Sequence, residues 1–206
     1  MASGSSLGGA RPKASVRDVN GELWIAKFPS KDDLIDLGAW EMVANEMAHF
    51  SSAMTMLGYS DGASAADGVS YLEIAEFIIL NGANVDADLS ELFKRIVLSI
   101  AISNTDDHLR NHGFILTKDG WILSSVYDVN PNHYRGGLKL NISENDNSQD
   151  FSLALSVAPF FRLSSNEAEK IINYIKKVVC DWRIFATKYK IPKGEQDLMS
   201  KAFLYS

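Results

Sequence analysis

Two acidic side chains and one amide lie within a single polar stretch of the sequence, residues 103–132. Asp106 is followed five positions later by Asn111, and Asp128 comes after a short hairpin pattern. Phosphoryl transfer needs such groups, because one carboxylate orients the attacking hydroxyl while an amide and a second carboxylate hold Mg²⁺ against nucleotide phosphates. We therefore predict Asp106 as the catalytic base and Asn111 and Asp128 as magnesium ligands.

The residues around Asp106 offer alternative interpretations. Asp107 could serve as the base instead, but the spacing to Asn111 favours Asp106 and leaves Asp107 to support the loop. Arg110 could contact a phosphate or form an ion pair with a neighbouring acid. An isolated acid and amide at this spacing more often cap turns, because short motifs recur by chance. The later Asp128 is what favours the functional interpretation.

His108 and His112 stand four positions apart, as zinc ligands do when they share one face of a helix. The segment has the composition of a loop, and the glutamate that acts as base in helical zinc sites is absent. Packing or hydrogen bonding is therefore the favoured role for both. The alternative is a hydrolytic metal site built from both histidines with Asp106 and Asp128.

A second group of candidates lies near the N-terminus and could bind a nucleotide. Lys27 closes a strand-like segment and could reach the α- and β-phosphates, with Glu41, or else Glu46, as its partner on the next helix. The sequence Ser6-Leu7-Gly8-Gly9-Ala10 could bring backbone N–H groups close to phosphates. The alternative for Lys27 is an ordinary lysine at the edge of a strand, with its charged end in water. The alternative for the glycine-rich stretch is a disordered N-terminal leader.

A small strand-containing front and a larger helical back must position these residues. Asn20-Gly21 between apolar runs predicts a hairpin, and apolar residues at the helical period predict a long helix ending just before Asp106. Ser164 with Glu167 is a capping box, from which an apolar stripe continues to Ala186. Predicted strands cover residues 14–17, 22–28, 113–116 and 121–124; predicted helices cover 38–48, 71–80, 89–101, 164–186 and 195–204; a flexible loop covers 58–69 and a polar region covers 130–150. This order predicts an α+β fold.

Composition limits the classes of protein to which the chain can belong. Its 206 residues are 46% hydrophobic and 22% charged, an ordinary globular composition. A net charge of -6 and a pI near 5.2 argue against a direct nucleic-acid surface. Cys180 is the only cysteine and is expected to be buried, so no disulfide framework is predicted. No apolar run reaches transmembrane length and no secretory signal is recognisable, so we expect a cytoplasmic protein without membrane contact.

Several segments together resemble the HipA family, bacterial serine/threonine kinases that act as toxins of toxin–antitoxin pairs. Protein kinases space the Asp and Asn of their catalytic loop as Asp106 and Asn111 are spaced. The resemblance runs through SSLGGARPK, IAKFPSKDD, GAWEMVANEMA, SAMTMLG, SNTDDHLRNHGF, YDVNPN and SVAPFFRLSSNEA. It implies a protein-kinase-like bilobal fold, with a reduced N-lobe at residues 1–48 and a mainly helical C-lobe at residues 49–206.

The resemblance also implies roles for residues and partners. Asp106 takes the catalytic position, Asn111 and Asp128 take the metal positions, and Lys27 takes the nucleotide lysine. Residues 6–13 take the glycine-rich loop, in which Ser6, with Ser5 adjacent, matches a serine that family members autophosphorylate. ATP and Mg²⁺ are the implied cofactors. The implied partners are a translation-related protein substrate, such as an aminoacyl-tRNA synthetase, and a helix-turn-helix antitoxin.

The chain departs from the family pattern in two places. Relatives carry an N-terminal subdomain ahead of the glycine-rich loop, and further strands that supply the adenine-binding hinge where Ala48 here runs directly into His49. A shortened kinase-like module that binds the antitoxin without a nucleotide pocket is therefore the alternative to an active kinase. The metal-dependent hydrolase is the second alternative.

Overall fold

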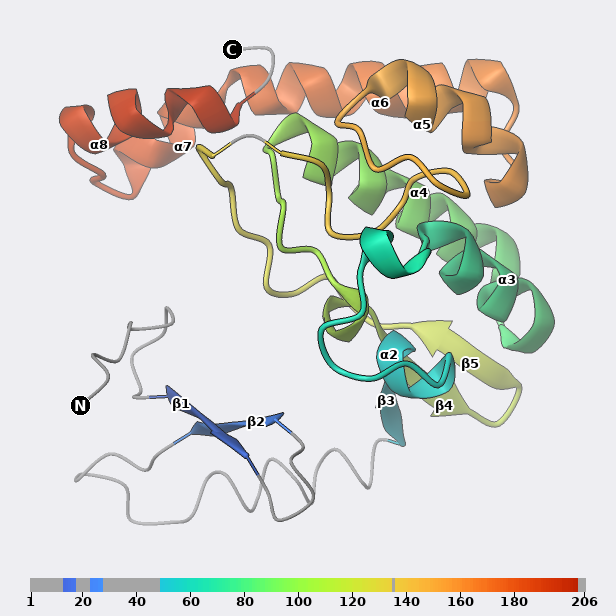
Figure 1. Ribbon diagram of the computed structural model, residues 1–206. Helices are drawn as coiled ribbons and strands as arrows, with labels where there is room; N and C mark the ends of the chain where they lie inside the picture. The colour runs from blue at the N-terminus through green and yellow to red at the C-terminus, as the bar shows by residue number, and fades with distance from the viewer. Residues whose placement is uncertain (1–12, 18–22, 28–48, 135, 204–206) are drawn as a thin grey trace. The chain divides into compact units, whose positions relative to one another are not determined.

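The computed structural model describes residues 13–17, 23–27, 49–134 and 136–203 (Figure 1). The chain divides into two compact units, Met1–Phe50 and Ser51–Ser206. In the first unit, β1 (Lys13–Arg17) pairs antiparallel with β2 (Leu23–Lys27), and Lys13 lies opposite Lys27. Both predicted strands are thus confirmed. The helix predicted at residues 38–48 lies outside the described residues.

A second sheet has the strand order β3 (Phe50–Ser52), β4 (Gly113–Thr117), β5 (Gly120–Leu123). β4 and β5 form the predicted antiparallel hairpin, with Phe114 opposite Leu123. Gly120 is required in its turn, because its φ is 132° and a Cβ there would lie 2.8 Å from the carbonyl oxygen of Asn81. One helical turn, α2 (Ala53–Met56), follows β3 directly.

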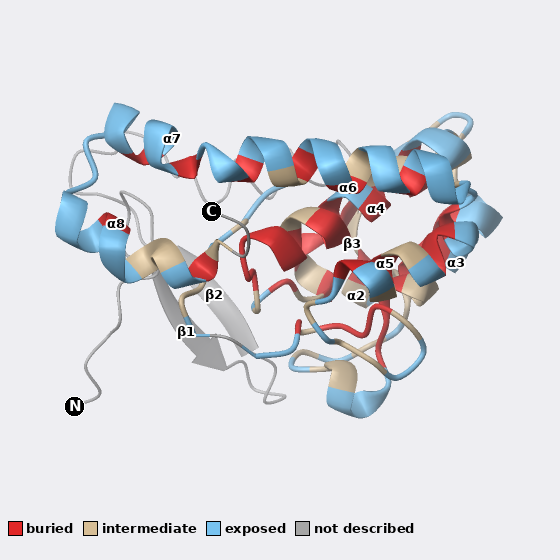
Figure 2. Cartoon of the chain, turned by 90° about the horizontal axis from the view of Figure 1, so that it is seen from above, coloured by how far each residue is buried: buried red, intermediate tan, exposed pale blue. Residues whose placement is uncertain are grey.

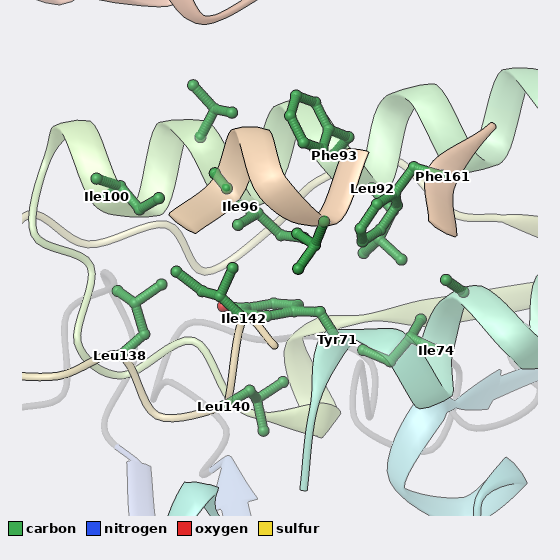
Figure 3. Packing of buried hydrophobic residues seen from close by; sticks show 14 of the residues in the cluster. Tyr71, Ile74, Leu92, Phe93, Ile96, Ile100, Leu138, Leu140, Ile142 and Phe161 are labelled. Atoms are coloured by element: carbon green, nitrogen blue, oxygen red, sulfur yellow. The ribbon is translucent and has the colours of Figure 1, made fainter. Parts of the chain in front are cut away.

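Two helices form the centre of the second unit. α3 (Tyr71–Asn81) begins at a capping box of Ser70 and Glu73, and α4 (Val85–Ala101) follows after a short connection. α4 is buried along most of its length, because apolar residues recur along it at the helical period. Figure 3 shows side chains of α3 and α4 meeting in one hydrophobic cluster. Both predicted helices are confirmed.

The C-terminal third is helical, as predicted, but its long apolar stripe is divided between two helices. α5 (Phe151–Val157) precedes α6 (Ser165–Cys180), which starts at the predicted capping box of Ser164 and Glu167 and packs on α4. The stripe continues into α7 (Trp182–Lys188), and α8 (Lys193–Met199) follows. Buried residues follow one side of α6 (Figure 2).

The expectation that Cys180 is buried was wrong. Cys180 is exposed at the C-terminal end of α6, next to Val179, which faces the core. Successive helical residues differ in direction by about 100°, so one of two neighbouring apolar residues generally leaves the buried face. Among the described residues, no helix is both long and apolar enough to cross a membrane.

The polar region predicted at residues 130–150 contributes directly to the core. Its described residues form no helix or named strand, yet Leu138, Leu140 and Ile142 are completely or almost completely buried. Figure 3 shows these three side chains close to Tyr71 of α3. Backbone hydrogen bonds between Asn141 and both Val69 and Tyr71 fix the segment beside the start of α3. Its apolar residues alternate with polar ones, a pattern that the surrounding polar composition conceals.

Candidate active site

Asp106 and Asn111 lie in one tight loop that follows α4. The helix ends at Ala101, and Ser103 then takes a positive φ of 51° as the chain turns. A single 3₁₀ turn covers Leu109–Asn111. The buried Asn111 donates from Nδ2 to the carbonyl oxygen of Asp106, 3.1 Å away, so its amide oxygen remains available as a ligand. The carboxylate of Asp106 is exposed to solvent.

Asp107, the neighbouring acid, is instead buried and holds the loop to the core. Its Oδ2 accepts hydrogen bonds from the Tyr71 hydroxyl at 2.7 Å and the Ser99 hydroxyl at 3.2 Å. Its Oδ1 lies 3.1 Å from Nε2 of His112. Burial alone would raise the pKa of Asp107, but His112 and the two hydroxyl donors outweigh it and lower the pKa below its usual value. Asp107 is therefore a carboxylate that anchors the loop.

Asp128 belongs to an irregular segment that is hydrogen-bonded to the Asp106 loop on both of its sides. The Tyr127 hydroxyl donates to the carbonyl oxygen of Arg110 at 2.6 Å, and Asn132 Nδ2 donates to Thr105 Oγ1 at 2.7 Å. Burial, with the nearby carboxylates of Asp128 and Asp107, raises the pKa of Tyr127 to about 12. The two contacts bring the segment that carries Asp128 against the loop that carries Asp106 and Asn111.

Asp128 itself is exposed and adopts a positive φ of 55°. Its Oδ1 accepts a hydrogen bond of 2.9 Å from Asn130 Nδ2, which fixes the side chain within its own turn. Aspartate tolerates this left-handed conformation better than bulky residues do, because its short polar side chain can bond locally.

Two charged residues of α4 fix the direction in which the chain leaves β5 towards Asp128. Asp88 Oδ2 accepts from the backbone N–H of Leu123 at 2.9 Å, and Arg95 Nη2 donates to the carbonyl oxygen of Ser124 at 2.5 Å. Both charged side chains are buried. None of these positioning roles was predicted: Asp88 and Arg95 were not candidates, and Tyr127 and Asn132 appeared only within the motif YDVNPN. A signal existed for the first two, because charged residues one heptad apart beside an apolar stripe are unusual on a buried helix.

A pocket of about 230 Å³ opens beside Asp106. Its wall includes Asp61, His108, Arg110 and Lys139. Arg110 forms an ion pair with Asp61, which is one of the two roles predicted for it. Its Nη2 also lies 3.1 Å from His108 Nε2. Burial and then the Arg110 cation lower the pKa of His108, so its ring is neutral near pH 7.

His108 and His112 point to different surroundings, which removes the basis for a shared zinc site. His108 lines the pocket with Arg110, whereas His112 packs edge-on against Tyr71 with ring centroids 5.7 Å apart. Within the described ranges, no group of three or more His, Cys, Asp or Glu side chains is arranged to hold a metal ion.

The structure describes less of the predicted nucleotide-binding group. Lys27 is the last residue of β2, but its side chain lies outside the described part of the chain. Glu41, its runner-up Glu46, and the glycine-rich residues Ser5, Ser6, Gly8 and Gly9 also lie outside the described residues.

Comparisons with known proteins place the chain within a family. The family model described as the HipA-like C-terminal domain matches residues 46–182. A protein of Haemophilus influenzae named "Putative kinase" is 40% identical over 68 residues, which are 32% of this chain and 20% of that protein.

A chain of the solved complex of HipA, HipB and operator DNA, from the toxin–antitoxin system of Shewanella oneidensis MR-1, shares the fold with a TM-score of 0.61 at 15% identity. That match covers 93% of the present chain and 49% of the chain in the complex. The present chain therefore spans about half the length of this structural neighbour, and its match to the Haemophilus influenzae protein covers 20% of that protein. The resemblance found in the sequence is confirmed: the chain belongs to the family of HipA-like C-terminal domains.

Proposed function

We propose that the chain is an ATP-dependent protein serine/threonine kinase of the HipA type. The observation that carries this proposal is the pair of hydrogen bonds from Tyr127 and Asn132, which hold the segment around Asp128 against the loop of Asp106 and Asn111. Membership of the HipA-like family and the kinase name of a relative point to the same chemistry.

Each side chain of the site has a distinct task in this proposal. The exposed Asp106 carboxylate orients the acceptor hydroxyl and takes its proton, and the adjacent pocket admits the acceptor side chain. Asn111 and Asp128 supply the hard oxygen ligands that Mg²⁺ prefers. Bound Mg²⁺ would neutralise charge on the nucleotide phosphates. Asp107 keeps the loop in place and takes no part in proton transfer.

Lys27, with Glu41 as its ion-pair partner, and the loop containing Ser6, Gly8 and Gly9 would bind the ATP phosphates. The protein-kinase-like bilobal arrangement belongs to the same proposal, with residues 1–48 as the reduced N-lobe and residues 49–206 as the helical C-lobe.

The partners are inferred from the family rather than from the site. The neighbour's structure contains HipB and operator DNA, so a helix-turn-helix antitoxin is the partner we propose for this chain. The acidic net charge of -6 favours contact with that protein over direct contact with DNA. A translation-related protein such as an aminoacyl-tRNA synthetase is the proposed substrate, and the cytoplasm is the proposed compartment.

Substitution of Asp106 tests this function most directly. The chain and its Asp106→Asn variant are incubated with radiolabelled ATP, Mg²⁺ and candidate substrates, and incorporation into protein is measured. We expect transfer to fall at least about 100-fold, the usual contribution of a positioned general base. Asp119→Asn, an exposed acid in the β4–β5 turn, is the matched control and should leave transfer unchanged. Equal transfer by Asp106→Asn and the unsubstituted chain would remove Asp106 from the mechanism.

A further inference from the structure

Unsatisfied buried polar atoms gather around one small cavity beneath Asn111. Six buried side-chain nitrogen or oxygen atoms of the described residues have no hydrogen-bond partner. Three of the six are Arg95 Nη1, Asn104 Oδ1 and His112 Nδ1, and a fourth, His112 Nε2, faces the Asp107 carboxylate at 3.1 Å. All three side chains line a cavity of about 10 Å³, and they are 5%, 1% and 1% exposed. Unpaired buried polar groups are costly, so such a concentration requires a partner.

The hydrogen-bonding capacities of these atoms are complementary. Arg95 Nη1 can only donate, and Asn104 Oδ1 can only accept. The Nε2 atom of His112 lies 3.1 Å from the Asp107 carboxylate, so it is the nitrogen that carries the proton. In the neutral imidazole, in which only one ring nitrogen carries a proton, the other nitrogen, Nδ1, is then an acceptor. The cavity therefore offers one donor and two acceptors.

We propose that one internal water molecule occupies this cavity and binds Arg95, Asn104 and His112. Its oxygen accepts from Arg95 Nη1, and its two hydrogens are donated to Asn104 Oδ1 and His112 Nδ1. The cavity has the smallest volume that can hold one water, and a buried water typically makes about three hydrogen bonds. The Arg95 guanidinium disfavours a metal cation there, while the Asp107 carboxylate and the Asn104 oxygen disfavour an anion.

The bound water joins α4 to the loop that carries Asp106, and the segment of Asp128 forms part of the cavity wall. Arg95 belongs to α4, Asn104 and His112 belong to the loop that carries Asp106, and Tyr127 and Val129 of the cavity wall flank Asp128. The water thus supports the base of the candidate active site without touching a substrate. This inference stands on the cavity and its atoms, and it holds whether or not the chain is a kinase.

A high-resolution crystal structure of the chain tests the proposal directly. We expect density for one ordered water with contacts of about 2.7–3.2 Å to Arg95 Nη1, Asn104 Oδ1 and His112 Nδ1. In solution, the same water should give long-lived nuclear Overhauser contacts to protons of the cavity wall. An empty cavity, or a structure in which these three atoms bond directly to one another, would overturn the proposal.

Two variants separate the water site from the general cost of losing a buried amide. Asn104→Leu removes one acceptor, so we expect the water to be lost and Tm to fall by roughly 3–10 °C. Asn141→Leu removes another buried amide, whose Nδ2 bonds the carbonyl oxygen of Ala65, and should lower Tm while leaving the water in place. A water that persists unchanged in Asn104→Leu would contradict the assignment.

Discussion

Asp106 and Asp107 are chemically identical neighbours with opposite surroundings. Asp106 is exposed beside a pocket, whereas Asp107 is 5% exposed and bonded to Tyr71 and Ser99. The sequence could separate the two only by their spacing to Asn111. It could not predict what surrounds Asp107, because Tyr71 lies 36 residues away and reaches it only through the packing of α3.

Asp107→Asn tests the anchoring role through the pH dependence of stability. The pKa of Asp107 is lowered on folding, so its contribution is full above the unfolded-state pKa of about 3.9 and is lost as pH falls through the folded-state pKa. We expect the variant to lose about 3 kcal/mol of unfolding free energy at pH 7 and a smaller amount near pH 3, which is below the unfolded-state pKa. Urea unfolding of both proteins at the two pH values measures this. An equal loss at both would argue against an ionised anchor.

Tyr127→Phe tests whether the hydrogen bond to Arg110 positions the segment of Asp128. Loss of the hydroxyl should cost about 1 kcal/mol of unfolding free energy. In the proposed kinase it should also raise the Mg²⁺ concentration needed for half-maximal phosphoryl transfer, because Asp128 is held less firmly. Tyr134→Phe, at a side chain that is 73% exposed, is the control and should change neither quantity. An unchanged Mg²⁺ requirement in Tyr127→Phe would separate this bond from the metal site.

At the scale of elements, α4 does more than fill the core. Its apolar face was predictable from the 3.6-residue period. The hydrogen bonds from Asp88 and Arg95 to the backbone at the end of β5 were not predictable, because bonds to a distant backbone leave no periodic pattern in the sequence. The break between α6 and α7 at Asp181 was missed for a related reason. The apolar stripe continues through the break, and periodicity alone does not show where a helix ends.

Substitutions of Asp88 distinguish its hydrogen bond from its charge. Burial raises the pKa of Asp88, so the charged form costs stability near neutral pH while its oxygen satisfies the Leu123 N–H. We expect Asp88→Ala to lose about 1–3 kcal/mol, because a buried N–H is left unpaired. Asp88→Asn keeps an acceptor and should be close to neutral or stabilising at pH 7. Thermal or urea unfolding of the pair decides, and a similar loss in both variants would mean that the charge itself is needed.

At the scale of the whole molecule, the sequence identified the family and most helices and strands of the second unit. The combination of motifs was specific enough for this, and the match to residues 46–182 confirms it. Asp106, Asn111 and Asp128 could be selected as candidates because their residue types and spacing are local properties. The two hydrogen bonds that bring their segments together could not be predicted, because they join residues that are 17 and 27 positions apart in the sequence.

Binding of nucleotide tests the kinase against the alternative of a binding module without a nucleotide pocket. A ligand that binds only the folded chain stabilises it, by about 2.7 kcal/mol at a concentration 100 times its Kd. For a chain of this size we expect ATP with Mg²⁺ to raise Tm by roughly 5–10 °C under those conditions. Asp128→Asn should remove the part of the shift that depends on Mg²⁺. If millimolar ATP produces no thermal shift and no calorimetric heat, the binding module is favoured.

The segment at residues 130–150 has a practical consequence for anyone who engineers this family. Its polar composition suggests a loop that would accept an epitope tag, a fusion junction or a split-protein boundary, since loops usually tolerate insertions. Leu138, Leu140 and Ile142 are nevertheless part of the hydrophobic core. An insertion between them would pull apolar side chains into water and yield aggregated protein, whereas the exposed turn at Lys118 and Asp119 offers a safer place to open the chain.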